Sequence, residues 1–91
     1  MDNERRADLG IIAVRAAASV TNVWRTETAE TSIADVLAYI AHTCDRLGLS
    51  PEDTFAAGLR SYEGDFEDGP KANRVFSGAT VSFADMKLWG E

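Results

Sequence analysis

The one histidine and the one cysteine of the chain, His42 and Cys44, stand only two residues apart. On a regular helix this spacing points their side chains about 160° away from each other, so they cannot form a catalytic pair. We expect Cys44 to be a buried structural thiol. A structural zinc site takes four ligands, nearly always with more Cys and His than two residues supply, so structural zinc is excluded.

A polar ridge is expected on the same helix, opposite its apolar stripe. Its members are spaced by four, three and four residues and are Asp35, Tyr39, His42 and Arg46. The ridge is either a solvated face or a secondary surface for a partner or a substrate. Acid–base catalysis would also need a nucleophile and a second orienting group, and neither lies within reach in the sequence. We therefore predict no catalytic residue, no bound metal and no cofactor.

An acidic segment between residues 52 and 68 contains six carboxylates and a single base, Arg60. The six are Glu52, Asp53, Glu63, Asp65, Glu67 and Asp68. Counted from Glu63, an EF-hand would need glycine and glutamate where Asp68 and Arg74 stand, so a calcium loop of that type is excluded. Three interpretations remain: a solubilising surface, a patch that docks on a basic protein, and a divalent-ion site. We predict the second.

Four aromatic residues are candidate anchors for a partner: Trp24, Tyr39, Tyr62 and Trp89. Trp89 lies one residue before Gly90 in a charged terminus. Its indole either fastens the tail to the body of the protein or contacts another chain. We predict Trp89 as a partner-binding residue.

Three helices are expected to position these residues, over about 4–23, 32–47 and 51–63, followed by a tail over 64–91. In the first helix, apolar residues recur in steps of three and four at Leu9, Ile12, Ala13, Ala16, Val20 and Val23. Further apolar residues widen this stripe, so the helix is expected to have neighbours on two sides. The tail is predicted to contain either a short β element or a last helical turn.

The second helix carries the clearest apolar stripe, at Ile33, Val36, Leu37, Ile40, Cys44 and Leu47. Thr31 or Ser32 is expected to cap it, and Gly48 to end it. Ser50 and Pro51 then mark the start of the third helix, so the second and third helices should form an αα-hairpin. Its predicted core is Val36, Ile40, Cys44, Leu47, Phe55 and Leu59. The fold expected is a small, mainly α, single domain over residues 1–91.

Composition limits the function classes. The 91 residues carry a net charge of −6 and a pI of about 4.6, which argues against direct binding of nucleic acid. The longest apolar run is interrupted by Arg15, and the first residues are charged, so neither a membrane span nor a signal peptide is expected. A single cysteine favours a reducing compartment, so we expect a cytoplasmic protein.

Residues 31–62 contain Asp-Val-Leu, then His42-x-Cys44-Asp45-Arg46 and Gly48, and close on Ser61-Tyr62-Glu63. This stretch resembles short helical accessory proteins of phages and prophages. Some of these are anti-CRISPR or other anti-defence inhibitors, which cover basic nucleic-acid-binding surfaces. The resemblance implies a non-enzymatic inhibitor in the host cytoplasm, with a CRISPR effector or another nucleic-acid-binding complex as partner.

The runs 33–40 and 45–52 also resemble the C-terminal half of MazG-like nucleoside triphosphate pyrophosphohydrolases. That resemblance implies a Mg²⁺-dependent enzyme in which Asp35 is a metal ligand. Ser32 stands where the family has a glutamate, and Glu27 and Glu30 lie too close to Asp35 to form the opposing helix. A third alternative is a homodimeric helical module whose wide first helix forms the interface.

Overall fold

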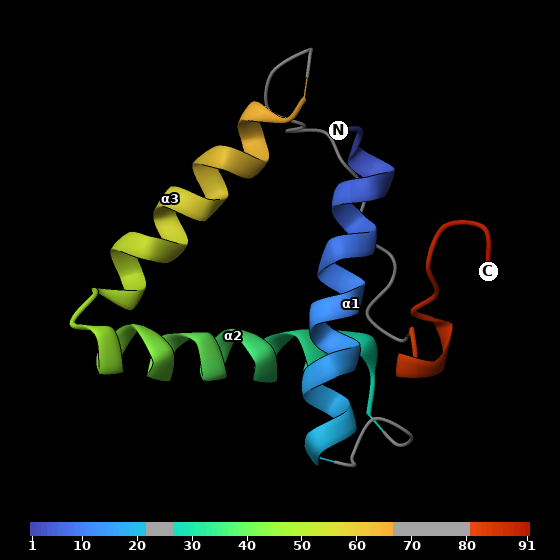
Figure 1. The fold of residues 1–91 in the computed structure, drawn as a ribbon, viewed down its shortest axis with the longest axis horizontal. Helices are drawn as coiled ribbons and strands as arrows, with labels where there is room; N and C mark the ends of the chain where they lie inside the picture. The colour runs from blue at the N-terminus through green and yellow to red at the C-terminus, as the bar shows by residue number, and fades with distance from the viewer. Residues whose placement is uncertain (22–26, 67–80) are drawn as a thin grey trace. The chain divides into compact units, whose positions relative to one another are not determined.

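The computed structural model describes residues 1–21, 27–66 and 81–91 (Figure 1). It contains three α-helices, α1 (Asn3–Thr21), α2 (Ala29–Leu47) and α3 (Pro51–Gly64), and one short 3₁₀ helix, η1 (Phe83–Asp85). The prediction of a small, mainly α fold with α2 and α3 as a hairpin is confirmed. The predicted end of the first helix at residue 23 lies outside the described residues.

The chain divides into two compact units. The terminal unit consists of Met1–Val36 and Ser77–Glu91, and the hairpin unit of Leu37–Phe76. Helix α2 begins in the first unit and ends in the second. The single domain that we predicted stays a prediction.

The terminal unit is built on a small apolar core. Val14 and Ala18 of α1 are buried with Phe83, and Val36 and Met86 pack against them. The packed side of α1 is therefore opposite the predicted stripe, whose large members Leu9, Ile12 and Val20 are exposed. Val14 and Ala18 are two of the residues that we expected to widen this stripe, and the sequence left the packed side open because the helix is apolar around much of its girth.

Residues 81–83 pair with the start of α2. Thr28 and Ser82 form an isolated antiparallel bridge. The Ala29 N–H donates to the Val81 carbonyl at 2.7 Å, and the Phe83 N–H donates to the Glu27 carbonyl at 3.1 Å. Within the described residues, the tail thus combines one β-bridge with the short helical turn η1; a hairpin around Gly78 would lie outside them.

Helix α2 starts three residues earlier than predicted. The Thr28 hydroxyl accepts the Thr31 N–H at 3.2 Å and so caps the helix, whereas Thr31 and Ser32 lie inside its first turn. Ser32 is buried, and its hydroxyl donates to a Glu27 carboxylate oxygen at 3.2 Å. The prediction of Thr31 or Ser32 as the cap is therefore wrong; the sequence did not separate them from Thr28, because all three are capping residue types.

The turn between α2 and α3 follows the predicted signals closely. Gly48 has φ of 73°, its N–H donates to the Asp45 carbonyl at 3.2 Å, and the Leu49 N–H donates to the Cys44 carbonyl at 2.8 Å. These two bonds are the Schellman pattern that ends many helices. Ser50 then accepts the Asp53 N–H at 3.2 Å with Pro51 opening α3, so both cap predictions are confirmed.

The hairpin buries less than the sequence predicts. Cys44 is buried at 4% exposure, as expected, and Phe55 is half-buried, but Leu47 and Leu59 are 66% and 62% exposed. The prediction of Ile40, Leu47 and Leu59 as core residues of the hairpin is wrong, and Val36 packs in the terminal unit instead. In Figure 1, α2 and α3 diverge from their turn, so α2 does not enclose Leu59, which lies about two turns into α3.

Candidate functional site

The acidic segment is divided by the length of α3. Glu52 and Asp53 lie in the first turn of this helix, Glu63 lies in its last turn, and Asp65 follows it. Glu67 and Asp68 lie outside the described residues. With a rise of about 1.5 Å per residue, Glu52 and Glu63 are about 16 Å apart along the helix axis, or roughly two Debye lengths at physiological salt. The described acids therefore form two groups, one at each end of α3.

An apolar row connects these two acidic groups. Glu52, Phe55, Leu59 and Glu63 follow one another in steps of three, four and four residues, so they share one face of α3. We call them the acid-flanked row. Leu59, near the middle of the row, is among the most exposed large apolar side chains of the described residues. Solvent thus meets apolar side chains with a carboxylate at either end.

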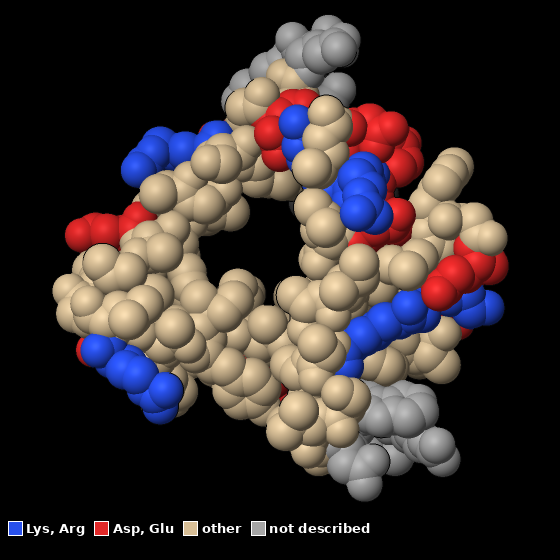
Figure 2. All heavy atoms as spheres, in the orientation of Figure 1, with Lys and Arg blue, Asp and Glu red and all other residues tan. Residues whose placement is uncertain are grey.

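Helix α2 contributes a second apolar row to the hairpin unit. Leu37, Ile40 and Cys44 share one face of α2 in steps of three and four residues. Because Cys44 is buried, this is the face that packs in the hairpin, yet Ile40 is 41% exposed and Leu37 is exposed as well. Figure 2 shows mostly uncharged atoms over α2 and α3, with charged side chains projecting from the outer edges of the hairpin.

The polar ridge lies on the other side of α2. Tyr39, His42 and Arg46 are exposed, and Asp35 is half-buried. Because His42 is exposed while Cys44 is buried, the expected separation of these two side chains is confirmed. Nothing in the described contacts distinguishes the ridge from a solvated helix face.

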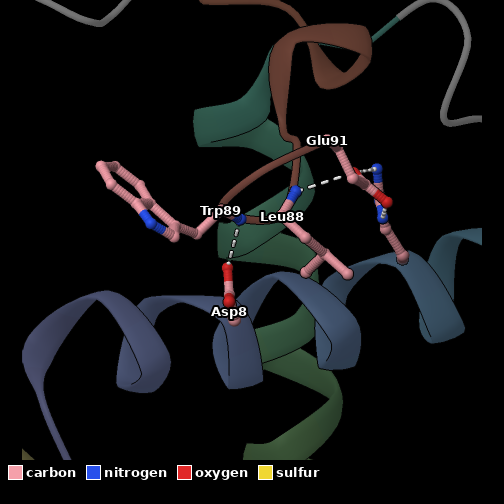
Figure 3. A network of polar contacts seen from close by, with 5 residues as sticks. Asp8, Leu88, Trp89 and Glu91 are labelled. Atoms are coloured by element: carbon pink, nitrogen blue, oxygen red, sulfur yellow. Dashed lines mark hydrogen bonds and ion pairs between the residues drawn. The ribbon is translucent and has the colours of Figure 1, made fainter.

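Trp89 belongs to a polar clasp that holds the C-terminal residues against α1 (Figure 3). The Trp89 N–H donates to the Asp8 carboxylate at 2.8 Å, and the Leu88 N–H donates to the Glu91 carboxylate at 2.8 Å. The Arg15 guanidinium donates to both oxygens of Glu91, at 2.9 and 3.3 Å. The Trp89 backbone is thus fastened, while its indole extends to the side opposite Glu91 and the residue is 78% exposed.

The clasp shifts the pKa values of its two charged members. The hydrogen bonds from Arg15, and then that from the Leu88 N–H, lower the pKa of Glu91. The same contact with Glu91 raises the pKa of Arg15. Both side chains are solvent-accessible, so the pair contributes little to the stability of the whole protein. Its effect is local, on residues 88–91.

A hollow of about 430 Å³ lies beside the clasp, lined by Arg15, Ser19, Phe83, Ala84 and Met86. Its lining is mainly apolar, and the guanidinium of Arg15 is already engaged by Glu91. We did not predict this hollow, because it forms between α1 and a segment more than 60 residues later. Contacts over such a separation are not indicated by any local sequence pattern.

Neither a metal site nor a membrane span is found among the described residues. In this part of the chain, no three His, Cys, Asp or Glu side chains gather closely enough to hold a metal ion. Ser32, at the position where the MazG-like resemblance would need a glutamate, is buried, and its hydroxyl donates to a Glu27 carboxylate oxygen. No described helix combines the length and apolar character needed to cross a membrane.

No protein-family model matches the chain, and no match was found among the curated proteins or the solved structures. The resemblances to phage accessory proteins and to MazG-like enzymes therefore depend on the sequence motifs alone.

Proposed function

We propose that this chain is a non-enzymatic protein-interaction module that binds a partner with a basic surface through the hairpin unit. The observation that carries this proposal is the acid-flanked row, in which the exposed Leu59 and the half-buried Phe55 lie between two carboxylates. Full burial of an exposed leucine is favourable by about 1.5–3 kcal/mol before the entropic costs of association are subtracted. Carboxylates at the edge steer a cationic partner and disfavour an anionic one.

The motif resemblance extends this proposal to an inhibitor of the anti-defence type. An acidic protein that covers the basic surface of a CRISPR effector, or of another nucleic-acid-handling complex, competes with the phosphate backbone for the same cationic side chains. The support for this step is the net charge of −6 and the stretch 31–62.

The test is affinity capture from host lysate on the immobilised protein, followed by binding isotherms with the purified partner at several salt concentrations. We expect a partner with a basic surface whose binding weakens as salt rises. Mg²⁺-dependent turnover of a nucleoside triphosphate that Asp35→Ala abolishes would contradict the proposal and favour the hydrolase alternative.

A homodimeric module is the second candidate, and the exposed stripe of α1 favours it. Leu9 and Ile12 are exposed and Val20 is 85% exposed, although all three lie on one face of the helix. Light scattering over a range of concentrations tests this alternative. A dimer that Ile12→Ser converts to a monomer would support it.

A further inference from the structure

We infer that the hairpin unit takes one occupant of a particular kind: a cationic amphipathic helix of a partner protein. The helix would lie along the acid-flanked row of α3 and the apolar row of α2. This inference depends on the proposed function and names the kind of partner surface that the site fits.

The geometry of the apolar rows favours a helix. Phe55 and Leu59 on α3, and Leu37 and Ile40 on α2, follow helical spacing and are exposed or half-buried. An amphipathic helix supplies matching apolar side chains at every third or fourth position, so it can contact apolar rows of this spacing along their length. The distance from Glu52 to Glu63, about 16 Å, corresponds to roughly three helical turns of the partner. Within the described ranges no strand edge is available for pairing with an extended peptide.

The charges of the hairpin unit favour a partner helix of positive charge. Its described residues 37–66 carry five carboxylates and two guanidiniums. Arg46 belongs to the polar ridge of α2, and Arg60 is turned about 100° from Leu59 on α3. The acid-flanked row, in contrast, ends in Glu52 and Glu63. Lys or Arg side chains along the edges of the bound helix complement these carboxylates, whereas an acidic helix is repelled by them.

The probe is a fluorescein-labelled peptide of 18 leucines and lysines, ordered so that the leucines form one helical face. It is titrated with the full chain, and fluorescence anisotropy and far-UV circular dichroism are recorded. One control peptide has the same composition in an order without an apolar face. The other keeps the amphipathic order with glutamate in place of lysine. We expect saturable binding with a gain of helical signal for the first peptide, and at least about tenfold weaker binding for both controls.

Two pairs of variants locate the peptide. Leu59→Ser should weaken binding at least about tenfold, because it removes the central apolar contact, while Val20→Ser on exposed α1 leaves binding unchanged. The double variant Glu52→Gln with Glu63→Gln should weaken binding and flatten its salt dependence. The matched control, Glu30→Gln with Asp45→Asn, changes the net charge equally at exposed carboxylates outside the acidic segment and should retain most of the affinity. Circular dichroism verifies that every variant is folded.

Four outcomes would overturn the inference. The scrambled peptide binding as well as the amphipathic one would show general charge attraction. Equal losses in the two charge variants would place the site elsewhere. A dimer in light scattering that Leu59→Ser dissociates would assign the face to a second copy of the chain. A captured basic partner whose binding is insensitive to Leu59→Ser would refute helix docking and leave the proposed function intact. The proposed function itself would be contradicted if no partner with a basic surface bound the chain.

Discussion

Single residues in this protein hold segments that packing alone does not secure. The carboxylate of Glu91 accepts hydrogen bonds from both the Arg15 guanidinium and the Leu88 N–H, and it thereby fixes the end of the chain on α1. Trp89 sits between these contacts with its backbone fastened to Asp8. An exposed indole on a fastened backbone loses little conformational freedom when a partner buries it, which suits a binding anchor.

The clasp should open in acid. The pKa of Glu91 is lowered in the folded protein, so its contribution is fully present above the ordinary glutamate pKa of about 4.3 and is lost as the pH falls through the lowered value. Amide hydrogen exchange of Leu88, whose N–H donates to the Glu91 carboxylate, should show protection at neutral pH that disappears in the acidic range. Glu91→Gln should abolish this pH dependence, whereas Glu63→Gln in the hairpin unit should retain it. Protection of Leu88 that still disappears in acid in the Glu91→Gln variant would contradict the clasp.

Gly48 and Gly58 differ in backbone conformation, so their replacement by alanine should have opposite effects on stability. Gly48 has φ of 73°, a conformation that costs an L-residue about 1–2 kcal/mol, so Gly48→Ala should destabilise the hairpin by about that amount. Gly58 lies inside α3 with nothing within 4 Å of an added methyl group, so Gly58→Ala should stabilise it by about 0.5–1 kcal/mol. Urea unfolding of the two variants measures both effects. Equal effects of the same sign would show that the α2–α3 turn is not formed in solution.

At the scale of the elements, the parts of the fold with local signals were predictable. Ser50 and Pro51 mark the start of α3, and Gly48 marks the end of α2, because capping depends on residues within one turn of the helix end. The packed side of α1 depends instead on Phe83, more than 60 residues away, and no local pattern predicts that contact. The exposure of Leu59 was unpredictable for a similar reason, since it follows from the angle at which two helices leave their turn.

The packing of η1 on α1 should make a large contribution to the stability of the terminal unit. Phe83 is the largest side chain of the cluster with Val14 and Ala18, so Phe83→Ala should cost about 3–5 kcal/mol. That cost is a large share of the 5–15 kcal/mol typical of small domains. Val20→Ala, at a side chain that is 85% exposed, should change stability by less than about 0.5 kcal/mol. Thermal unfolding compares the two variants; similar melting temperatures would contradict the packing of the tail on α1.

At the scale of the whole molecule, charge was easier to predict than its distribution. The net charge of −6 and the concentration of acids after residue 51 can be counted in the sequence. The separation of these acids into two groups follows from the helix that carries them, because α3 places Glu52 and Glu63 about three turns apart. We did not predict the acid-flanked row, because we considered the carboxylates and the apolar residues of this helix separately. Its spacing of three, four and four residues is nevertheless present in the sequence.

The negative charge of the acidic segment should control how fast the chain associates with a basic partner. Charge reversal to lysine at Glu63, Asp65, Glu67 and Asp68 converts the C-terminal part of the acidic segment from attraction to repulsion of a basic surface. Because long-range attraction acts on the encounter, the association rate of the partner should fall, and its dependence on salt should weaken or reverse. Alanine at Tyr39, His42 and Arg46 on the polar ridge serves as the control and should change the rates less. Stopped-flow association at several salt concentrations, with the partner captured from lysate, measures both sets. If the ridge variants lose binding while the reversed chain associates normally at every salt concentration, the partner binds the ridge of α2 and not the acidic segment.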